Sequence, residues 1–215
     1  MTRLGLVDYG MGNLHSVQRA FERLAVEVVP IAAGRDTDQT LESCTALVLP
    51  GVGAFDPAME RLESTGLAGL LKAWCAAGRP LLGICLGLQL LFEASEEGSR
   101  RGLGLLGGEV RALPQHSRQP IPHMGWEPLI PAQASPLLPA DEPPTWVYFV
   151  HSFAAAPSDD TVVAARVDFG GEPVTAAVWN GQIGACQFHP EKSSRHGEAI
   201  LRRWLAWLER QGQQP

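Results

Sequence analysis

The sequence predicts an α/β protein with an open, mostly parallel twisted sheet, helices on both faces and an antiparallel hairpin extension, that is, a flavodoxin-like core. In the first half of the chain, short apolar segments alternate with segments of helical periodicity, which is the pattern of a parallel sheet with crossover helices. The apolar segments lack polar alternation, as is typical of strands covered on both faces. Later in the chain, Asn180-Gly181 separates two apolar runs and predicts a hairpin.

The elements of the first half follow from periodicity and capping. We expect strands at 3–7, 26–31, 46–50 and 80–84, and helices that start after Asn13, cover 56–77 with a break near Gly66, and cover 86–95. The Asn13 side chain can accept a hydrogen bond from the first turn of its helix, and apolar residues behind it recur at helical spacing.

The second half is rich in proline and predicts a different organisation. Residues 112–145 should form loops and short edge strands, because proline has no N–H to donate to a sheet. We expect strands at 145–153 and 161–167, and then one on each side of Asn180-Gly181. The last helix carries an apolar stripe that suits a core contact better than a cofactor. Because no repeat or low-complexity linker interrupts the chain, residues 1–215 are expected to form a single domain.

Composition restricts the class of protein. The chain has 215 residues, 45% of them hydrophobic, and a net charge of −6 without a run of Lys or Arg, which argues against nucleic acid as a partner. The longest apolar stretch, 80–92, contains Gln89 and is shorter than the roughly 20 residues of a membrane helix. Asp8 comes too early for a secretory signal. We therefore expect a cytoplasmic protein without a membrane partner.

Neither cofactor nor metal is expected. The six histidines lack metal-ligand spacing, and the four cysteines form no Cys-x-x-Cys pair. The segment GLGLLG at 102–107 matches a dinucleotide fingerprint in letters only, because the residues after it leave no room for the helix that such a site requires. Reduced, mostly structural thiols are the expectation for Cys44, Cys75 and Cys186.

Cys85 differs from the other cysteines because it lies between Gly83 and Gly87, where an expected strand meets an expected helix. Small neighbours permit the sharp turn of a nucleophile elbow. A thiol at a helix N-terminus is favoured as the thiolate, and the N–H of Leu86 can stabilise an oxyanion. The alternative is a buried cysteine whose glycines only allow close packing.

The segment QFHPEKS supplies a candidate base and its orienting group. His189 falls at the end of the expected last strand, and Glu191 can hold one nitrogen of its ring. The alternative is an ordinary surface turn, since 104 residues separate Cys85 from His189 by number. The glycines of LPGVGAF (49–55) also follow a strand and suit a second oxyanion donor or a simple turn.

The chain resembles the class I (triad) glutamine amidotransferases in three motifs, PGVGAF, GICLGLQLLF and HPEKS. The resemblance extends from Arg3 to the last helix. Within that family, VDYGMGNLHSV, PHMGWE and YFVHSF are similar to the glutaminase subunits of imidazole glycerol phosphate synthase, an enzyme of histidine biosynthesis.

The resemblance implies a reaction and a set of residues. Cys85 attacks the side-chain amide of L-glutamine, ammonia leaves, and water hydrolyses the thioester to glutamate. His189, aligned by Glu191, moves the protons. The implied oxyanion and substrate positions are Gly51, Val52, Gly53, Leu86, Gln89, Glu97, Ser152 and Phe153, with Glu96 as a competitor for Glu97.

The resemblance also implies a partner, a cyclase subunit with a (β/α)₈ barrel that forms a heterodimer with the chain. Ammonia would join phosphoribulosyl-formimino aminoimidazole carboxamide ribonucleotide there, and the products are imidazole glycerol phosphate and aminoimidazole carboxamide ribonucleotide. Candidate interface residues are Tyr9, Met11, Asn13, Met124 and Trp126, although Trp126 can equally cover the core edge. We expect the Gly51–Gly53 backbone to be misaligned while the partner is empty.

Two other classes of function stay open on the sequence. One is another cysteine-dependent enzyme on the same core, such as a different triad amidotransferase, a peptidase or a γ-glutamyl hydrolase. The other is a non-catalytic regulatory binding module, which the intact Cys85, His189 and Glu191 disfavour.

Overall fold

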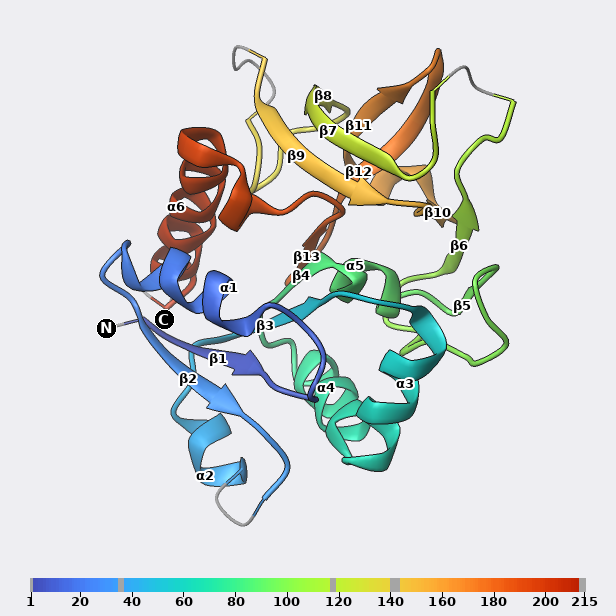
Figure 1. Cartoon of the computed structure of the whole chain (residues 1–215). Coiled ribbons are helices and arrows are strands. Elements are labelled where there is room, and N and C mark those ends of the chain that lie inside the picture. The colour runs from blue at the N-terminus through green and yellow to red at the C-terminus, as the bar shows by residue number, and fades with distance from the viewer. Residues whose placement is uncertain (1, 35–36, 117–118, 140–143, 213–215) are drawn as a thin grey trace.

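The computed structural model describes residues 2–34, 37–116, 119–139 and 144–212. Its main sheet is drawn in Figure 1 and has the order β2 (Glu27–Ile31), β1 (Arg3–Val7), β3 (Ala46–Gly51), β4 (Leu81–Cys85), β13 (Ile183–Cys186), β12 (Glu172–Asn180), β11 (Val163–Phe169) and β8 (Ile130–Pro131). Strands β2, β1, β3, β4 and β13 pair in parallel, and β12, β11 and β8 continue the sheet antiparallel. The predicted fold class is therefore confirmed.

In the centre of the sheet, both faces of β3 are buried. On β3, the side chains of Ala46 and Val48 join the core on the side of α1 (Leu14–Glu22) and α6 (Ser194–Gln211). Their neighbours Leu47 and Leu49 join the core on the side of α3 (Phe55–Ser64) and α4 (Leu67–Ala76). The absence of polar alternation in this strand is thus explained, since each residue meets a helix layer.

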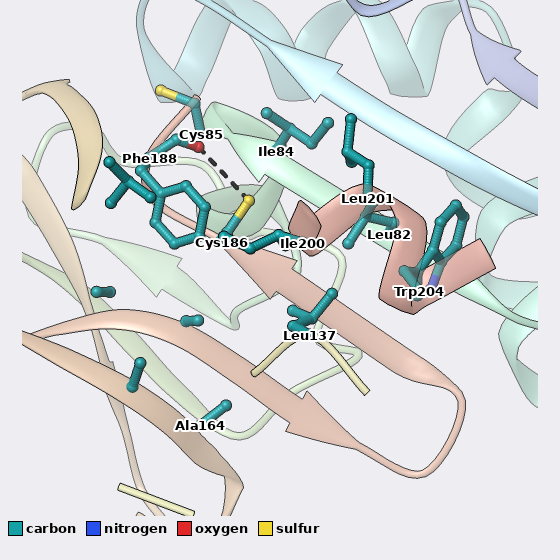
Figure 2. Packing of buried hydrophobic residues seen from close by; sticks show 14 of the residues in the cluster. Leu82, Ile84, Cys85, Leu137, Ala164, Cys186, Phe188, Ile200, Leu201 and Trp204 are labelled. Carbon is teal, nitrogen blue, oxygen red and sulfur yellow. Dashed lines mark hydrogen bonds between the residues drawn. The ribbon is translucent and has the colours of Figure 1, made fainter. Parts of the chain in front are cut away.

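The core between β4 and α6 shows how the sheet packs against a helix. Figure 2 shows Leu82 and Ile84 of the strand beside Leu201 and Trp204 of the helix. Trp204 is fully buried, so the apolar stripe of the last helix is a core contact as the sequence predicted.

Several residues that cap helices or favour turns begin or end elements where the sequence predicted. Asn13 caps α1 by accepting a hydrogen bond from the Ser16 N–H at 3.3 Å. Gly66 has φ +78 and separates α3 from α4, which confirms the predicted break, because this left-handed conformation suits glycine. Gly181 has φ +58 in the turn between β12 and β13, as the Asn-Gly pair predicted.

Two helices differ from the expectation. Helix α2 (Thr37–Glu42) was not predicted, and α5 covers only Leu86–Leu90 instead of 86–95. Helix α5 stops because later residues occupy its carbonyl groups. The Leu90 carbonyl accepts from the Leu103 N–H at 2.8 Å, and the Leu91 carbonyl accepts from Leu105 at 2.8 Å. The chain then enters β5 (Ala94–Ser95).

The second half contains two small sheets in place of one long strand. The strand expected at 145–153 is interrupted at Ser152. Before it, β9 (Trp146–His151) pairs with β7 (His123–Pro128); after it, β10 (Phe153–Pro157) pairs with β6 (Gly108–Ala112), which continues to β5. Strand β6 follows GLGLLG directly, so this segment opens no helix.

The remaining expectations for this half hold in part. The strand predicted at 161–167 begins with a 3₁₀ turn, η1 (Asp160–Val162), and continues as β11. The predicted irregular segment 112–145 contains β7 and β8, while its residues 117–118 and 140–143 lie outside the described part of the chain. No helix among the described residues is long and apolar enough to cross a bilayer.

We expect Gly87→Ala to lower the free energy of unfolding by about 3 kcal/mol or more, as overpacking against rigid backbone does. A Cβ at this position of α5 would lie 1.8 Å from the Leu49 carbonyl oxygen. Gly69→Ala in α4 is the control, because a Cβ there meets nothing within 4 Å. Alanine should stabilise that helix by about 0.5–1 kcal/mol. Urea unfolding followed by circular dichroism measures both, and equal stability of the two variants would contradict the packing argument.

Candidate active site

Cys85 lies on a strained turn between β4 and α5. Its backbone has φ +55 and ψ −112, values that non-glycine residues seldom adopt. Gly83 and Gly87 make the turn possible. A Cβ at Gly83 would lie 3.0 Å from both the Ala185 Cβ and the Gly87 carbonyl oxygen, and one at Gly87 would collide with β3. The two glycines are thus required by close packing, and the packing places the cysteine at the carboxyl end of its strand.

A cavity of about 350 Å³ opens at this turn. It is lined by Val52, Gly53, Cys85, Leu86, Gln89, Glu97, Pro122, Val150, His151, Ser152, Phe153, His189 and Lys192. Nine of these were predicted as catalytic or substrate-binding positions, and they come from both halves of the chain. The cavity therefore joins the parallel sheet to the small sheets of the second half.

His189 follows the last strand of the main sheet and faces Cys85. Its backbone N–H donates to the Tyr148 carbonyl at 3.0 Å, and its side chain hydrogen-bonds the Cys85 sulfur. Its Nδ1–H donates to Glu191 Oε1 at 2.7 Å, and the two side chains are only 3% and 2% exposed. The three residues of the predicted triad are therefore in contact, because the His189 ring hydrogen-bonds both Cys85 and Glu191.

The turn that follows His189 returns Glu191 to the ring. Residues Pro190–Lys192 form a 3₁₀ turn, η2. The Ser193 hydroxyl donates to the His189 carbonyl at 2.7 Å and accepts from the Tyr148 N–H at 2.9 Å. This buried hydroxyl ties the turn to β9, so the carboxylate and the imidazole are held together by the backbone as well as by their own hydrogen bond.

The electrostatics of the site favour a protonated His189. Burial by itself lowers the pKa of this imidazole, but hydrogen bonds and charge interactions with Cys85 and Glu191 outweigh it and raise the pKa from 6.5 to about 9. Because the folded-state value is the higher one, this interaction stabilises the fold fully below about pH 6.5 and is lost as the pH rises through about 9.

The segment after β3 contributes to the cavity wall. Gly51 pairs with Cys85 across β3 and β4, and Val52 and Gly53 line the cavity together with Leu86. Gly53 has φ +102, which glycine adopts at low cost. Gly51 lies behind the lining, where a Cβ would come within 2.6 Å of the Tyr9 hydroxyl oxygen.

The polar pocket positions are held by the backbone around them. The Gln89 side-chain N–H donates to the Phe153 carbonyl at 2.9 Å. Glu97 lines the cavity and accepts from the Phe55 N–H at 2.9 Å, whereas Glu96 is absent from the lining and accepts from the Ala112 N–H at 2.8 Å. Of the two competing glutamates, geometry thus places Glu97 in the cavity.

The predicted interface residues are divided between surface and core. Met124 and Trp126 lie on β7 beside the cavity and are 62% and 44% exposed. Met11 is half-buried, and Asn13 is exposed and caps α1. Tyr9 differs from the others, because it is only 2% exposed and its hydroxyl donates to the Pro50 carbonyl at 2.9 Å. Burial, and to a lesser degree the neighbouring Cys85, raises the pKa of Tyr9.

Sequence reasoning missed several residues of the site. Pro122, Val150, His151 and Lys192 line the cavity, and Gln187 lies behind it with its side chain within hydrogen-bonding reach of Cys85. The only available signal was their position inside motifs already singled out. Within the described part of the chain, no group of three or more His, Cys, Asp or Glu residues could hold a metal ion.

Comparison with known proteins adds family relationships to this geometry. The family model described as "Glutamine amidotransferase class-I" matches residues 5–207. "Imidazole glycerol phosphate synthase subunit HisH" of Synechococcus sp. (strain CC9902) is 58% identical over 212 residues, which cover 99% of this chain and 97% of the relative. A subunit of the same description, HisH 2 of Prochlorococcus marinus (strain MIT 9313), is also 58% identical, over 97% of this chain and 96% of the relative.

Solved structures show the same fold at lower identity. "Structure of PurLQS from Thermotoga maritima" superposes with a TM-score of 0.73 at 21% identity and covers 96% of this chain and 99% of the other. A putative GMP synthase subunit from Thermoplasma acidophilum superposes with a TM-score of 0.71 at 20% identity, over 99% of this chain and 96% of the other.

We expect His151 to make the fold sensitive to acid. Burial lowers the pKa of this histidine from 6.5 to about 3, with the neighbouring His123 and His189 adding to the effect and a hydrogen bond to the Phe153 carbonyl opposing it. The unfolded chain therefore binds the proton first, and stability falls as the pH drops below about 6.5, by up to about 1.4 kcal/mol per pH unit.

The measurement is urea unfolding of the wild type and His151→Gln between about pH 4 and about pH 7.5. The variant should lose less stability on acidification, because glutamine does not titrate. Exposed His15→Gln is the control and should leave the pH dependence as in the wild type. Equal slopes for His151→Gln and the wild type would show that His151 is not buried as the neutral ring.

Proposed function

This chain belongs to the class-I glutamine amidotransferase family and is a glutaminase subunit of imidazole glycerol phosphate synthase in histidine biosynthesis, and we propose that Cys85, His189 and Glu191 are its catalytic residues. The observation that carries the assignment is the convergence of these three side chains at one cavity. Cys85 and His189 line it, and Glu191 holds the far nitrogen of the imidazole at 2.7 Å.

The first half of the reaction releases ammonia. The Cys85 thiolate attacks the side-chain carbonyl carbon of L-glutamine, a C–S bond forms, and the carbonyl electron pair moves to the oxygen. The imidazolium of His189 protonates the amide nitrogen, the C–N bond breaks, and ammonia leaves a γ-glutamyl thioester. The raised pKa of His189 supports this starting state, because the ring carries the proton that the leaving group needs.

The second half of the reaction restores the enzyme. His189, now neutral, takes a proton from water while the water oxygen attacks the thioester carbon. The C–S bond breaks, glutamate leaves, and the thiolate faces the imidazolium again. Glu191 keeps the ring in one orientation throughout and stabilises its positive charge.

The oxyanion of both steps needs donors at the elbow and in the glycine segment. The N–H of Leu86 belongs to the first turn of α5, where backbone donors have no partner within the helix. A second donor comes from the Gly51–Gly53 segment, of which Val52 and Gly53 line the cavity. Both donors are backbone groups, so their alignment depends on the conformation of the loop rather than on a side chain.

Glutamine recognition uses the opposite wall of the cavity. The N–H groups of the Gln89 side chain are directed to protein acceptors, which leaves its Oε1 to accept from the substrate amide. The Glu97 carboxylate uses one oxygen on the Phe55 N–H, and its other oxygen suits the α-ammonium group. Ser152 and Phe153 line the same cavity as Gln89 and Glu97.

A synthase subunit requires a partner subunit, and we assign that role to a cyclase with a (β/α)₈ barrel in a heterodimer. Met124 and Trp126 support this, because they expose apolar surface on β7 beside the cavity. Met11 and Asn13 belong to the neighbouring loop and helix start. In this arrangement ammonia passes to the cyclase and joins its nucleotide substrate, phosphoribulosyl-formimino aminoimidazole carboxamide ribonucleotide, to give imidazole glycerol phosphate and aminoimidazole carboxamide ribonucleotide.

We expect Cys85→Ser to abolish glutamate release and Glu191→Gln to reduce kcat by about 10²–10⁴-fold, because an amide cannot hold the imidazolium. The measurement is glutamate formation from glutamine by the assembled synthase. Glu198→Gln on α6 is a matched carboxylate control that should retain wild-type activity, since Glu198 pairs with Arg202 near the surface. An active Cys85→Ser protein would refute the proposed nucleophile.

We also expect glutamate release to depend on the partner. If the Gly51–Gly53 backbone is misaligned while the cyclase is empty, the rate should rise by at least about 10²-fold when the cyclase and its nucleotide are added, as for gain of one oxyanion donor. Equal rates with and without them would contradict this control. Cyclase without nucleotide separates the effect of docking from the effect of the ligand.

A further inference from the structure

Gln187 is an unexpected residue at its position in the core. It follows β13 in an apolar stretch, between Cys186 and Phe188, and is 0% exposed. A buried amide is unfavourable unless its donors and acceptor are paired, so an apolar side chain would be the simpler choice here. Figure 2 shows the two flanking residues, where the Cys186 sulfur donates to the Phe188 carbonyl. Gln187 itself points toward the elbow.

The orientation of the Gln187 amide follows from a backbone carbonyl. The Phe153 carbonyl can only accept, so the Gln89 side chain must present its NH₂ group to it, at 2.9 Å. The same NH₂ group lies 3.1 Å from Gln187, which must therefore present its oxygen to Gln89. The NH₂ group of Gln187 is left to face the Cys85 sulfur at 3.8 Å.

We propose that Gln187 is a further catalytic residue, whose side-chain N–H donates to the Cys85 sulfur and holds it as a thiolate aimed into the cavity. The inference rests on the proposed role of Cys85 as the nucleophile. The strained backbone at the elbow places the Cα of Cys85, but rotation about its Cα–Cβ bond stays free to choose among staggered positions. The Gln187 N–H and the His189 side chain, both at the sulfur, together select one of them.

The same donor acts twice in the reaction. Before the attack it stabilises the negative sulfur, and when the thioester is hydrolysed it stabilises the thiolate that leaves. Since Gln187 also accepts from Gln89, it connects the nucleophile to a residue that recognises the substrate. Gln187 is therefore well placed to couple a correctly bound glutamine to a correctly aimed sulfur.

Several titratable groups surround the sulfur and set the background for a pH measurement. They are His189 with Glu191 from the turn after β13, Tyr9 from the loop after β1, Cys186 on β13, and His151, Glu97 and Lys192 around the cavity. Gln187 is uncharged, so replacing it with an uncharged residue removes the hydrogen bond and leaves these charges in place.

The test is the pH dependence of Cys85 alkylation by iodoacetamide, read by peptide mass spectrometry so that the other cysteines do not contribute. The full chain is used in wild-type form and as Gln187→Met, which has a similar length and no donor. We expect the midpoint of the alkylation rate to rise by about one pH unit in the variant, as for loss of a hydrogen bond to a charged acceptor. Thr175→Val, a buried polar change on β12 outside the cavity lining, is the control and should keep the wild-type midpoint.

Gln187→Glu gives a second reading in the assembled synthase. A carboxylate can still accept from Gln89 but faces the sulfur with an acceptor, so kcat should fall by at least about 10-fold while KM for glutamine changes by no more than about 2-fold. If Gln187 only filled space, the neutral Gln187→Met variant would keep the wild-type alkylation midpoint.

In the wild type, the side-chain amide resonances of Gln187 should titrate with the same midpoint as alkylation. This measurement needs no variant and remains valid if a substitution fails to fold. An unchanged alkylation midpoint in Gln187→Met would overturn the role of Gln187. Gln187 amide chemical shifts that stay constant through the alkylation midpoint would do the same. An absence of Cys85 alkylation in the wild type would instead refute the nucleophile and with it the proposed function.

Discussion

The contact between α5 and β3 is the constraint on which the site depends. Gly87 approaches the Leu49 carbonyl so closely that no side chain fits between them. This approach forces the turn after β4, and the turn forces Cys85 into a backbone conformation that its own side chain disfavours. Packing of the parallel sheet thus supplies the free energy that holds Cys85, the proposed nucleophile, at the strand end.

Polar groups behind this turn are organised around one backbone oxygen. The Phe153 carbonyl accepts from Gln89 and from His151, and through Gln89 it determines the orientation of Gln187 toward Cys85. Phe153 begins β10, so the small sheet of the second half sets the polar side of the cavity. The parallel sheet positions the sulfur, whereas the small sheet positions the amides and the ring that surround it.

The two buried histidines near the cavity show how environment assigns different roles. His189 has a carboxylate and a sulfur as neighbours, and its pKa rises to about 9 despite burial. His151 has a backbone carbonyl and other histidines, and its pKa falls to about 3. One ring is thus favoured in its protonated form, as the proposed reaction requires, and the other as a neutral hydrogen-bonding group, although both line the same cavity.

The sequence by itself determined whatever depends on neighbours along the chain. Asn13 begins a helix, Gly66 separates two, and Asn180-Gly181 turns a hairpin, because capping and backbone preference act within a few residues. The motifs around Cys85 and His189 likewise predicted the family, which the comparisons show. Only the tertiary structure ended α5 at Leu90, split the strand at Ser152, buried Tyr9 and turned Gln187 toward the sulfur. Each of these is decided by a partner that is distant along the chain, and such a pairing leaves no local pattern from which it could be predicted.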